Sequence, residues 1–188
     1  MNQNAFAMID KERRKKLAFH LRQLSVGLTT NDDFEDNVMN DVTNGWLPEQ
    51  YYRSKNAKQD DAVIIPMLEM CWGLYDDTRE HKLIVSDRLS DENLKVIARC
   101  ILFLHSDYEY EWPYEIFLLR PIFKRSLLEM LSILVINILT LGWHIRNYRK
   151  KEMEAFEEFK KLGAFEYWPF FRKVDYERQL EKQPFLKV

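Results

Sequence analysis

Hydrophobic residues recur every three or four positions over several stretches of the chain, which is the spacing of an amphipathic helix. The first stretch lies between Asp10, a suitable N-cap, and Gly27, a residue type that commonly ends helices. A second helix is expected to begin at Thr30 or Asn31, so that residues 10–42 form an antiparallel helical hairpin. In its first helix, the side chains predicted to face inward are Leu17, Leu21, Leu24 and Leu28.

The remaining positions of this first helix are strongly cationic. We interpret them as a solvated helix face, because the run is short and Glu12 interrupts it. Contact with phosphate or with an acidic membrane surface is the alternative. The cationic residues are Lys11, Arg13, Arg14, Lys15, Lys16 and Arg22.

Two further helices are predicted to form the core of a helical domain that covers residues 1–120. The helix over residues 60–77 begins at Asp60 or Asp61, and Pro66 either kinks it or lies in its first turn. The helix over residues 90–106 begins at Ser90, and after Arg99 its side chains are apolar on nearly every side. We expect residues 90–106 to be the central buried helix.

Residues 126–145 form a long apolar stretch that decides which class of protein this is. At 1.5 Å per residue, its about 20 residues match the roughly 30 Å hydrocarbon core of a bilayer. Glu129, Asn137 and His144 share one helix face, which instead suits packing against protein. The helix is therefore either membrane-associated or buried, and residues 121–161 continue it into a charged segment. Its candidate membrane residues are Leu127, Leu131, Leu134, Val135, Ile138, Leu141 and Trp143.

Basic residues flank this stretch on both sides, with Lys124 and Arg125 before it and Arg146 and Arg149 after it. A helix that dips into the inner leaflet would leave both flanks in the cytoplasm. We therefore expect the chain at the cytoplasmic face of the inner membrane, with contacts to membrane lipid. A soluble cytoplasmic protein is the alternative.

Aromatic residues concentrate in the segment EYEWPYE and in the tail, residues 162–188, which contains WPFF and is predicted to pack on the domain. Clustered Trp and Tyr beside charges are typical of interface anchors. Core packing is the alternative, because most Trp and Tyr side chains are largely buried. The candidate partner-contact residues are Tyr110, Trp112, Trp168 and Phe170.

The composition favours an all-α fold with about six helices, because Gly (5) and Pro (6) are scarce while 46% of the 188 residues are hydrophobic. The formal net charge is −2, so no nucleic-acid partner is expected. Cys71 and Cys100 lie in apolar helical patterns and are read as buried, reduced thiols.

Catalytic signatures are lacking, since the sequence contains no HExxH, GxSxG, GxGxxG or P-loop motif. His105, Asp107, Glu109 and Glu111 alternate along one segment and could in principle hold a metal ion. A loop with buried aromatics and solvated acids explains the same pattern. No cofactor is expected, and whether the chain is an enzyme is left open, with the balance against it.

Four motifs occur in order along the chain: LRQLSVGLTTNDDFED, WGLYDD, ARCILFLHSDYEYEWP and YWPFFRKVDYE. Together they resemble an uncharacterised family of small bacterial proteins. The resemblance covers most of the chain and implies that the apolar stretch is a regular part of the architecture. It carries no known function.

The first function hypothesis is a non-enzymatic, membrane-associated adaptor or regulatory protein with an unknown protein partner. A soluble helical binding protein, for instance a toxin-neutralising inhibitor or a regulatory subunit, is the second. A metal-dependent enzyme is the third. It would use His105 and Asp107 with the acidic pairs of the chain, which are Asp32-Asp33, Glu35-Asp36, Asp60-Asp61 and Asp76-Asp77.

Overall fold

The computed structural model describes residues 9–45, 61–112 and 164–183, together with positions 143, 146, 147, 150, 154 and 161. Within residues 9–45, 61–112 and 164–183 the chain is all-α: it forms five α-helices and two 3-10 helices, and the β-structure is a single isolated bridge between Thr30 and Lys82. The α-helices are α1 (Lys11–Ser25), α2 (Asn31–Asp41), α5 (Ile64–Trp72), α6 (Asp91–Leu104) and α9 (Lys173–Lys182). The 3-10 helices are η1 (Val85–Asp87) and η4 (Phe165–Tyr167).

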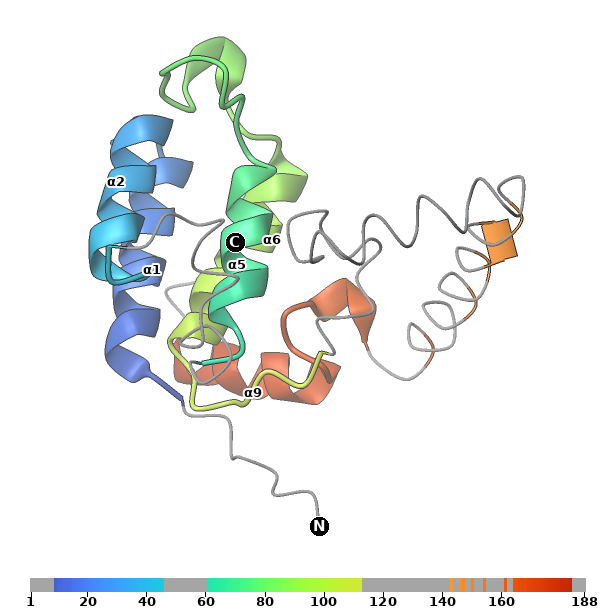
Figure 1. The fold of residues 1–188 in the computed structure, drawn as a ribbon. Coiled ribbons are helices and arrows are strands. Elements are labelled where there is room, and N and C mark those ends of the chain that lie inside the picture. The colour runs from blue at the N-terminus through green and yellow to red at the C-terminus, as the bar shows by residue number, and fades with distance from the viewer. Residues whose placement is uncertain are drawn as a thin grey trace. The chain divides into compact units, whose positions relative to one another are not determined.

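The chain divides into two compact units, Met1–Glu111 with Glu166–Val188, and Trp112–Phe165. In the first unit, α1 packs against both α2 and α6, and α9 packs against α6 (Figure 1). The sequence-based boundaries at residues 120 and 161 stay a prediction, because most of residues 113–163 lie outside the described part. The predicted stretch 126–145 lies outside it too, except for Trp143.

Helix capping follows the sequence closely. The side chains of Asp10, Thr30 and Ser90 each accept a hydrogen bond from a backbone N–H in the first turn of α1, α2 and α6. Acidic residues in these first turns also suit the positive end of the helix dipole. Pro66 lies in the first turn of α5, where its missing N–H costs no helical hydrogen bond.

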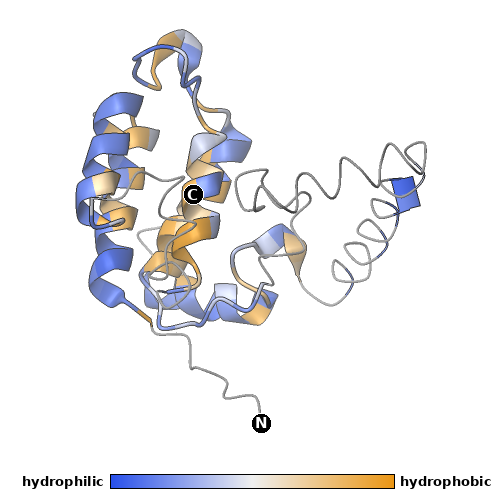
Figure 2. Cartoon of the chain, in the orientation of Figure 1, coloured by the Kyte–Doolittle hydropathy of each residue, from blue (hydrophilic) through white to orange (hydrophobic). Residues whose placement is uncertain are grey.

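Two helices differ from their predicted extent. α5 covers only Ile64–Trp72 of the predicted range 60–77, because Asp61 is engaged elsewhere and the chain turns after Gly73. α6 is buried only from Ile97 onward, and its first turn is exposed to solvent. Hydrophobic residues accordingly gather on α5 and the second half of α6 (Figure 2).

The core of the first unit is mostly aliphatic where α1, α2 and α6 meet. Leu28 does not belong to it, although the sequence predicted an inward-facing side chain. α1 ends at Ser25, and Gly27 turns the chain with a φ of 70°, so the helical periodicity stops before Leu28. Core side chains of these helices include Leu17, Leu21, Leu24, Phe34, Val38, Ile97, Ile101 and Leu104.

None of the helices in the described residues is long and apolar enough to cross a membrane.

Candidate functional site

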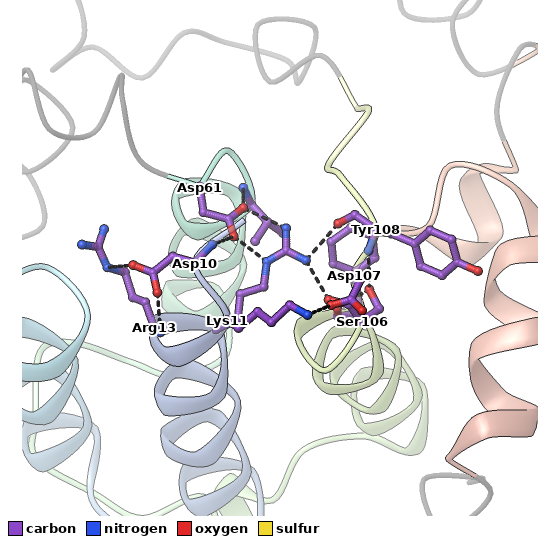
Figure 3. Close-up of polar contacts among 10 residues, drawn as sticks. Asp10, Lys11, Arg13, Asp61, Ser106, Asp107 and Tyr108 are labelled. Atoms are coloured by element: carbon purple, nitrogen blue, oxygen red, sulfur yellow. Dashed lines mark hydrogen bonds and ion pairs between the residues drawn. The ribbon is translucent and has the colours of Figure 1, made fainter. Parts of the chain in front are cut away.

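Arg14 is fully buried, although the sequence placed it on a solvated cationic face. Figure 3 shows the polar contacts of this region, with Asp61, Ser106 and Tyr108 labelled. The guanidinium of Arg14 forms a two-point ion pair with Asp61, in which the Nη2–Oδ1 distance is 2.8 Å. Nη1 also donates to the backbone oxygens of Ser106 (3.2 Å) and Tyr108 (2.9 Å). The guanidinium carbon lies 5.3 Å from the centre of the Phe103 ring. Arg14 therefore joins three separate segments of the first unit.

The carboxylate of Asp61 is equally engaged. Besides Arg14, it accepts hydrogen bonds from the backbone N–H groups of Asp10 (3.0 Å) and Val63 (3.3 Å). A buried ion pair contributes to stability only when its remaining polar atoms are also paired, and that condition is met here. Because the donors and acceptors are engaged within the chain, this network is structural and leaves no group to hold a ligand.

A second polar contact joins α1 to α2. His20 Nε2 lies 2.8 Å from Asp41 Oδ2, and Lys16 Nζ lies 3.5 Å from Asp41 Oδ1. The hydrogen bond from His20 holds the pKa of Asp41 below its ordinary value, with Lys16 adding to this effect. His20 is thus a hydrogen-bonded helix residue.

Three of the four predicted partner-contact residues are buried. Tyr110 and Phe170 pack edge-to-face against Phe103, with ring centres 6.2 and 5.0 Å apart. The indole N–H of Trp168 donates to the Tyr110 hydroxyl at 3.1 Å, and burial raises the pKa of Tyr110. Trp112 is buried and packs edge-to-face against Phe165. In the described chain these rings serve core packing, so a role in partner contact stays a prediction.

The alternating acids of residues 105–111 are exposed, while Tyr110 between them is buried. Asp107 pairs with Lys11 at 2.6 Å, which lowers the pKa of Asp107, and Glu111 pairs with Arg172 at 2.7 Å. Across residues 9–45, 61–112 and 164–183, no group of three or more His, Cys, Asp and Glu is placed to hold a metal ion.

Both cysteines are buried and free. Desolvation raises the pKa of the Cys71 and Cys100 thiols, because the apolar surroundings disfavour a thiolate. A neutral, buried thiol is a poor nucleophile, so neither cysteine suits covalent catalysis.

The sequence missed an exposed apolar cluster, which we name the junction patch and define as Val26, Leu28, Ile84 and Val85. Val85 is 89% exposed and Leu28 is 63% exposed. The two halves of the patch come from the end of α1 and from the loop before α6, and neither half stands out in the sequence. Leu28 was assigned to the core, and Ile84 and Val85 follow a polar loop.

Side-chain hydrogen bonds and one backbone bridge hold these two segments together. Lys82 Nζ donates to the backbone oxygen of Leu28 at 3.3 Å, and Thr30 bridges to Lys82. The buried side chain of Asn31 accepts from the N–H of His81 (2.7 Å) and donates to the backbone oxygen of Arg79 (3.0 Å). The patch is therefore fixed by hydrogen bonds beneath it.

Val85 has a φ of 53°, in the left-handed region. A β-branched residue is strained in this region, at a cost of about 1–3 kcal/mol. Its side chain gains little burial in return, because it is almost fully exposed. Strained residues of this kind concentrate at functional sites, which makes the junction patch the candidate functional site of the first unit.

The predicted membrane residues Leu127, Leu131, Leu134, Val135, Ile138 and Leu141 lie outside the described residues. Trp143 is helical and 64% exposed. Arg146 and Lys150 are also helical and exposed, and positions 143, 146 and 150 share one helix face because they are three and four residues apart.

No protein-family model, no curated protein and no solved structure matches the chain. The resemblance to a family of small bacterial proteins therefore stays a prediction.

Proposed function

We propose that the chain is a non-enzymatic adaptor or regulatory protein, and that the junction patch is where it contacts a protein partner. The observation that carries the proposal is the exposure of four aliphatic side chains on a hydrogen-bonded frame. Exposed apolar residues that cluster, unlike single ones, commonly mark interaction sites.

The polar chemistry of the first unit supports a binding role more than a catalytic one. The polar atoms of Arg14 and Asp61 are engaged in hydrogen bonds within the chain, and burial keeps the two thiols neutral. Catalysis needs a poised acid, base or nucleophile in a recess. Recognition by contact needs only apolar anchors and a rim of charge, and both are present around Val85.

A photo-crosslinking experiment tests this proposal. We would place p-benzoylphenylalanine at Leu28, at Val85 and, as a control, at Asn37, which is exposed on α2. The expected result is one protein adduct of the same mass from positions 28 and 85 and none from position 37. Equal labelling from all three positions, or no adduct from the patch, would contradict the proposal.

Attachment to a membrane through residues 126–145 is a second candidate property. The exposed Trp143, with Arg146 and Lys150 on the same helix face, supports it, because Trp and basic residues are enriched at membrane interfaces. Such a protein would act at the cytoplasmic face of the inner membrane, whereas a soluble binding protein or inhibitor is the alternative.

Membrane fractionation separates these alternatives. Retention through both high-salt and alkaline washes would indicate an integral helix, and release by salt alone would indicate a peripheral attachment through the basic flanks. Recovery in the soluble fraction without detergent would leave the junction patch as the basis of a soluble binding protein.

A further inference from the structure

The charges around the junction patch are predominantly uncompensated cations. Arg22 lies one turn before Val26, and Arg88 follows η1. Over the described residues, neither Arg22 nor Arg88 takes part in an ion pair, and the amino group of Lys82 bonds to a backbone oxygen. The backbone of Arg22 is hydrogen-bonded to that of Val26, and the backbone of Arg88 to that of Val85, so three positively charged residues lie next to the patch.

Most acidic residues of the same loops have partners or roles, and the exceptions are Asp77 and Glu80, which take part in no ion pair within the described residues. Arg79 pairs with Asp87 at 2.6 Å and lies 3.9 Å from Asp76. Asp91 and Glu92 lie in the first turn of α6, where the helix dipole stabilises negative charge. The pKa of His105 is lowered chiefly by burial, and the positive charges of Lys15 and Arg22 lower it further.

We propose that the junction patch binds an acidic amphipathic segment of another protein. The apolar side chains of that segment would cover the four aliphatic residues, and its carboxylates would face Arg22, Lys82 and Arg88. Complementary rim charges give specificity and fast association, while the apolar contact supplies affinity. This inference rests on the proposed function, because it names the partner of the same site.

An anionic lipid surface is the competing occupant, and the composition of the site disfavours it. Lipid-binding surfaces usually carry clusters of four to eight basic residues, often with aromatic side chains at the headgroup level. The rim has three cations, and the patch itself contains only Val, Leu and Ile.

The test combines the crosslinker at Val85 with removal of rim charge. In the test variant, Arg22→Gln and Arg88→Gln remove two charges from the rim. In the control variant, Arg178→Gln and Lys182→Gln remove two charges from α9, which lies at the opposite end of the first unit from η1 (Figure 1). Thermal unfolding followed by circular dichroism checks that both variants fold as the parent does.

We expect the yield of protein adduct to fall about fivefold or more in the Arg22→Gln/Arg88→Gln variant and to stay within twofold of the parent in the control. We also expect the crosslinked peptide, sequenced by mass spectrometry, to be net negative and amphipathic. Raising the salt concentration should weaken labelling of the parent more than labelling of the test variant.

Other outcomes separate the inference from the proposed function. A protein adduct whose peptide is neutral or basic, with a yield insensitive to the rim charges, would overturn the inference and keep the contact role of the patch. Loss of all adduct from position 85 would overturn both. In a further outcome, the purified chain gives no protein adduct but binds phosphatidylglycerol vesicles. If the Arg22→Gln/Arg88→Gln variant loses that vesicle binding, the patch is assigned to lipid.

Discussion

The two ends of α1 differ in the kind of side chain that they bury or expose. At its first turn, the buried Arg14 has its guanidinium paired with Asp61 and hydrogen-bonded to two backbone oxygens. At its last turn, the chain leaves the helix through Gly27 and presents Val26 and Leu28 to solvent beside Ile84 and Val85. One end buries a charge, and the other exposes aliphatic side chains.

This difference indicates which end of α1 is available to contact a partner protein. A charged residue is tolerated in a core only when its hydrogen bonds are complete, so the Arg14 end is committed to holding three segments together. The loops of the junction patch are held by backbone groups and by the side chains of Asn31 and Lys82. The four aliphatic side chains take no part in these hydrogen bonds and stay exposed. Substitutions at the two ends should therefore affect different properties.

The largest effect is expected from Arg14→Met. This change leaves the Asp61 carboxylate buried without its cation, which should lower the free energy of unfolding by about 3–5 kcal/mol. Urea denaturation followed by circular dichroism measures it. Lys15→Met, at the exposed neighbouring position, is the matched control and should change stability by less than about 0.5 kcal/mol.

A loss of less than about 1 kcal/mol in Arg14→Met would show that the network carries little of the stability. The double variant Arg14→Met/Asp61→Leu removes both charges and should recover only part of the loss. The backbone N–H groups of Asp10 and Val63 would then lack their acceptor, which is the reason that recovery stays incomplete.

Gly27→Ala should come next, with a loss of about 1–3 kcal/mol. Its φ of 70° disfavours any side chain, and an added Cβ would also overlap the side chain of Ile84. Gly45→Ala separates these two causes, because Gly45 has a φ of 79° with open space around the added Cβ. Equal losses in the two variants, measured by urea denaturation, would mean that contact with Ile84 adds nothing.

The two ends of α1 also show which features could be predicted from the sequence. Helix type and caps depend on local patterns, so Asp10, Thr30 and Ser90 were identifiable as N-caps, and burial of Leu17, Leu21 and Leu24 followed from periodicity. Arg14 also lies three residues before Leu17, at the edge of the apolar stripe. Its burial was missed because its partner, Asp61, is far away in the sequence and was assigned to helix capping.

The junction patch could not be predicted for a related reason. Leu28 was assigned to the core by its spacing from Leu21 and Leu24, although it follows Gly27, where the helix was expected to end and where the chain does turn. Ile84 and Val85 lie beside it only through long-range backbone contacts, such as that of Thr30 with Lys82. A site assembled from two loop segments leaves no periodic signal in either one.

Val85→Asn tests the strain at the patch. Asn tolerates the left-handed region better than Val, so this change should raise the free energy of unfolding by about 1 kcal/mol. Ile84→Asn is the control, because Ile84 has an extended φ of −129° and no comparable strain to relieve. If Val85→Asn unfolds at the parent's urea concentration, the residue is not strained. If the Val85→Asn variant is more stable but no longer crosslinks from position 28, then Val85 contributes to partner contact at a cost in stability.

The smallest effect is expected at the contact between His20 and Asp41, which lies between the two ends of α1. The hydrogen bond from His20 lowers the folded-state pKa of Asp41 from its ordinary value of 3.8. Its contribution is therefore present above about pH 4 and is lost as the pH falls through the lowered folded-state value.

Asp41→Asn should accordingly unfold at a lower temperature than the parent at pH 7, and the two melting temperatures should converge as the pH approaches 2. The difference should be small, because the Asp41 side chain is 41% exposed and solvent screens the pair. Melting temperatures measured from pH 7 to pH 2 provide the comparison. A gap that widens toward low pH would reverse the sign of the linkage. A gap as large as that of Arg14→Met would place the α1–α2 contact, rather than the buried network, at the centre of stability.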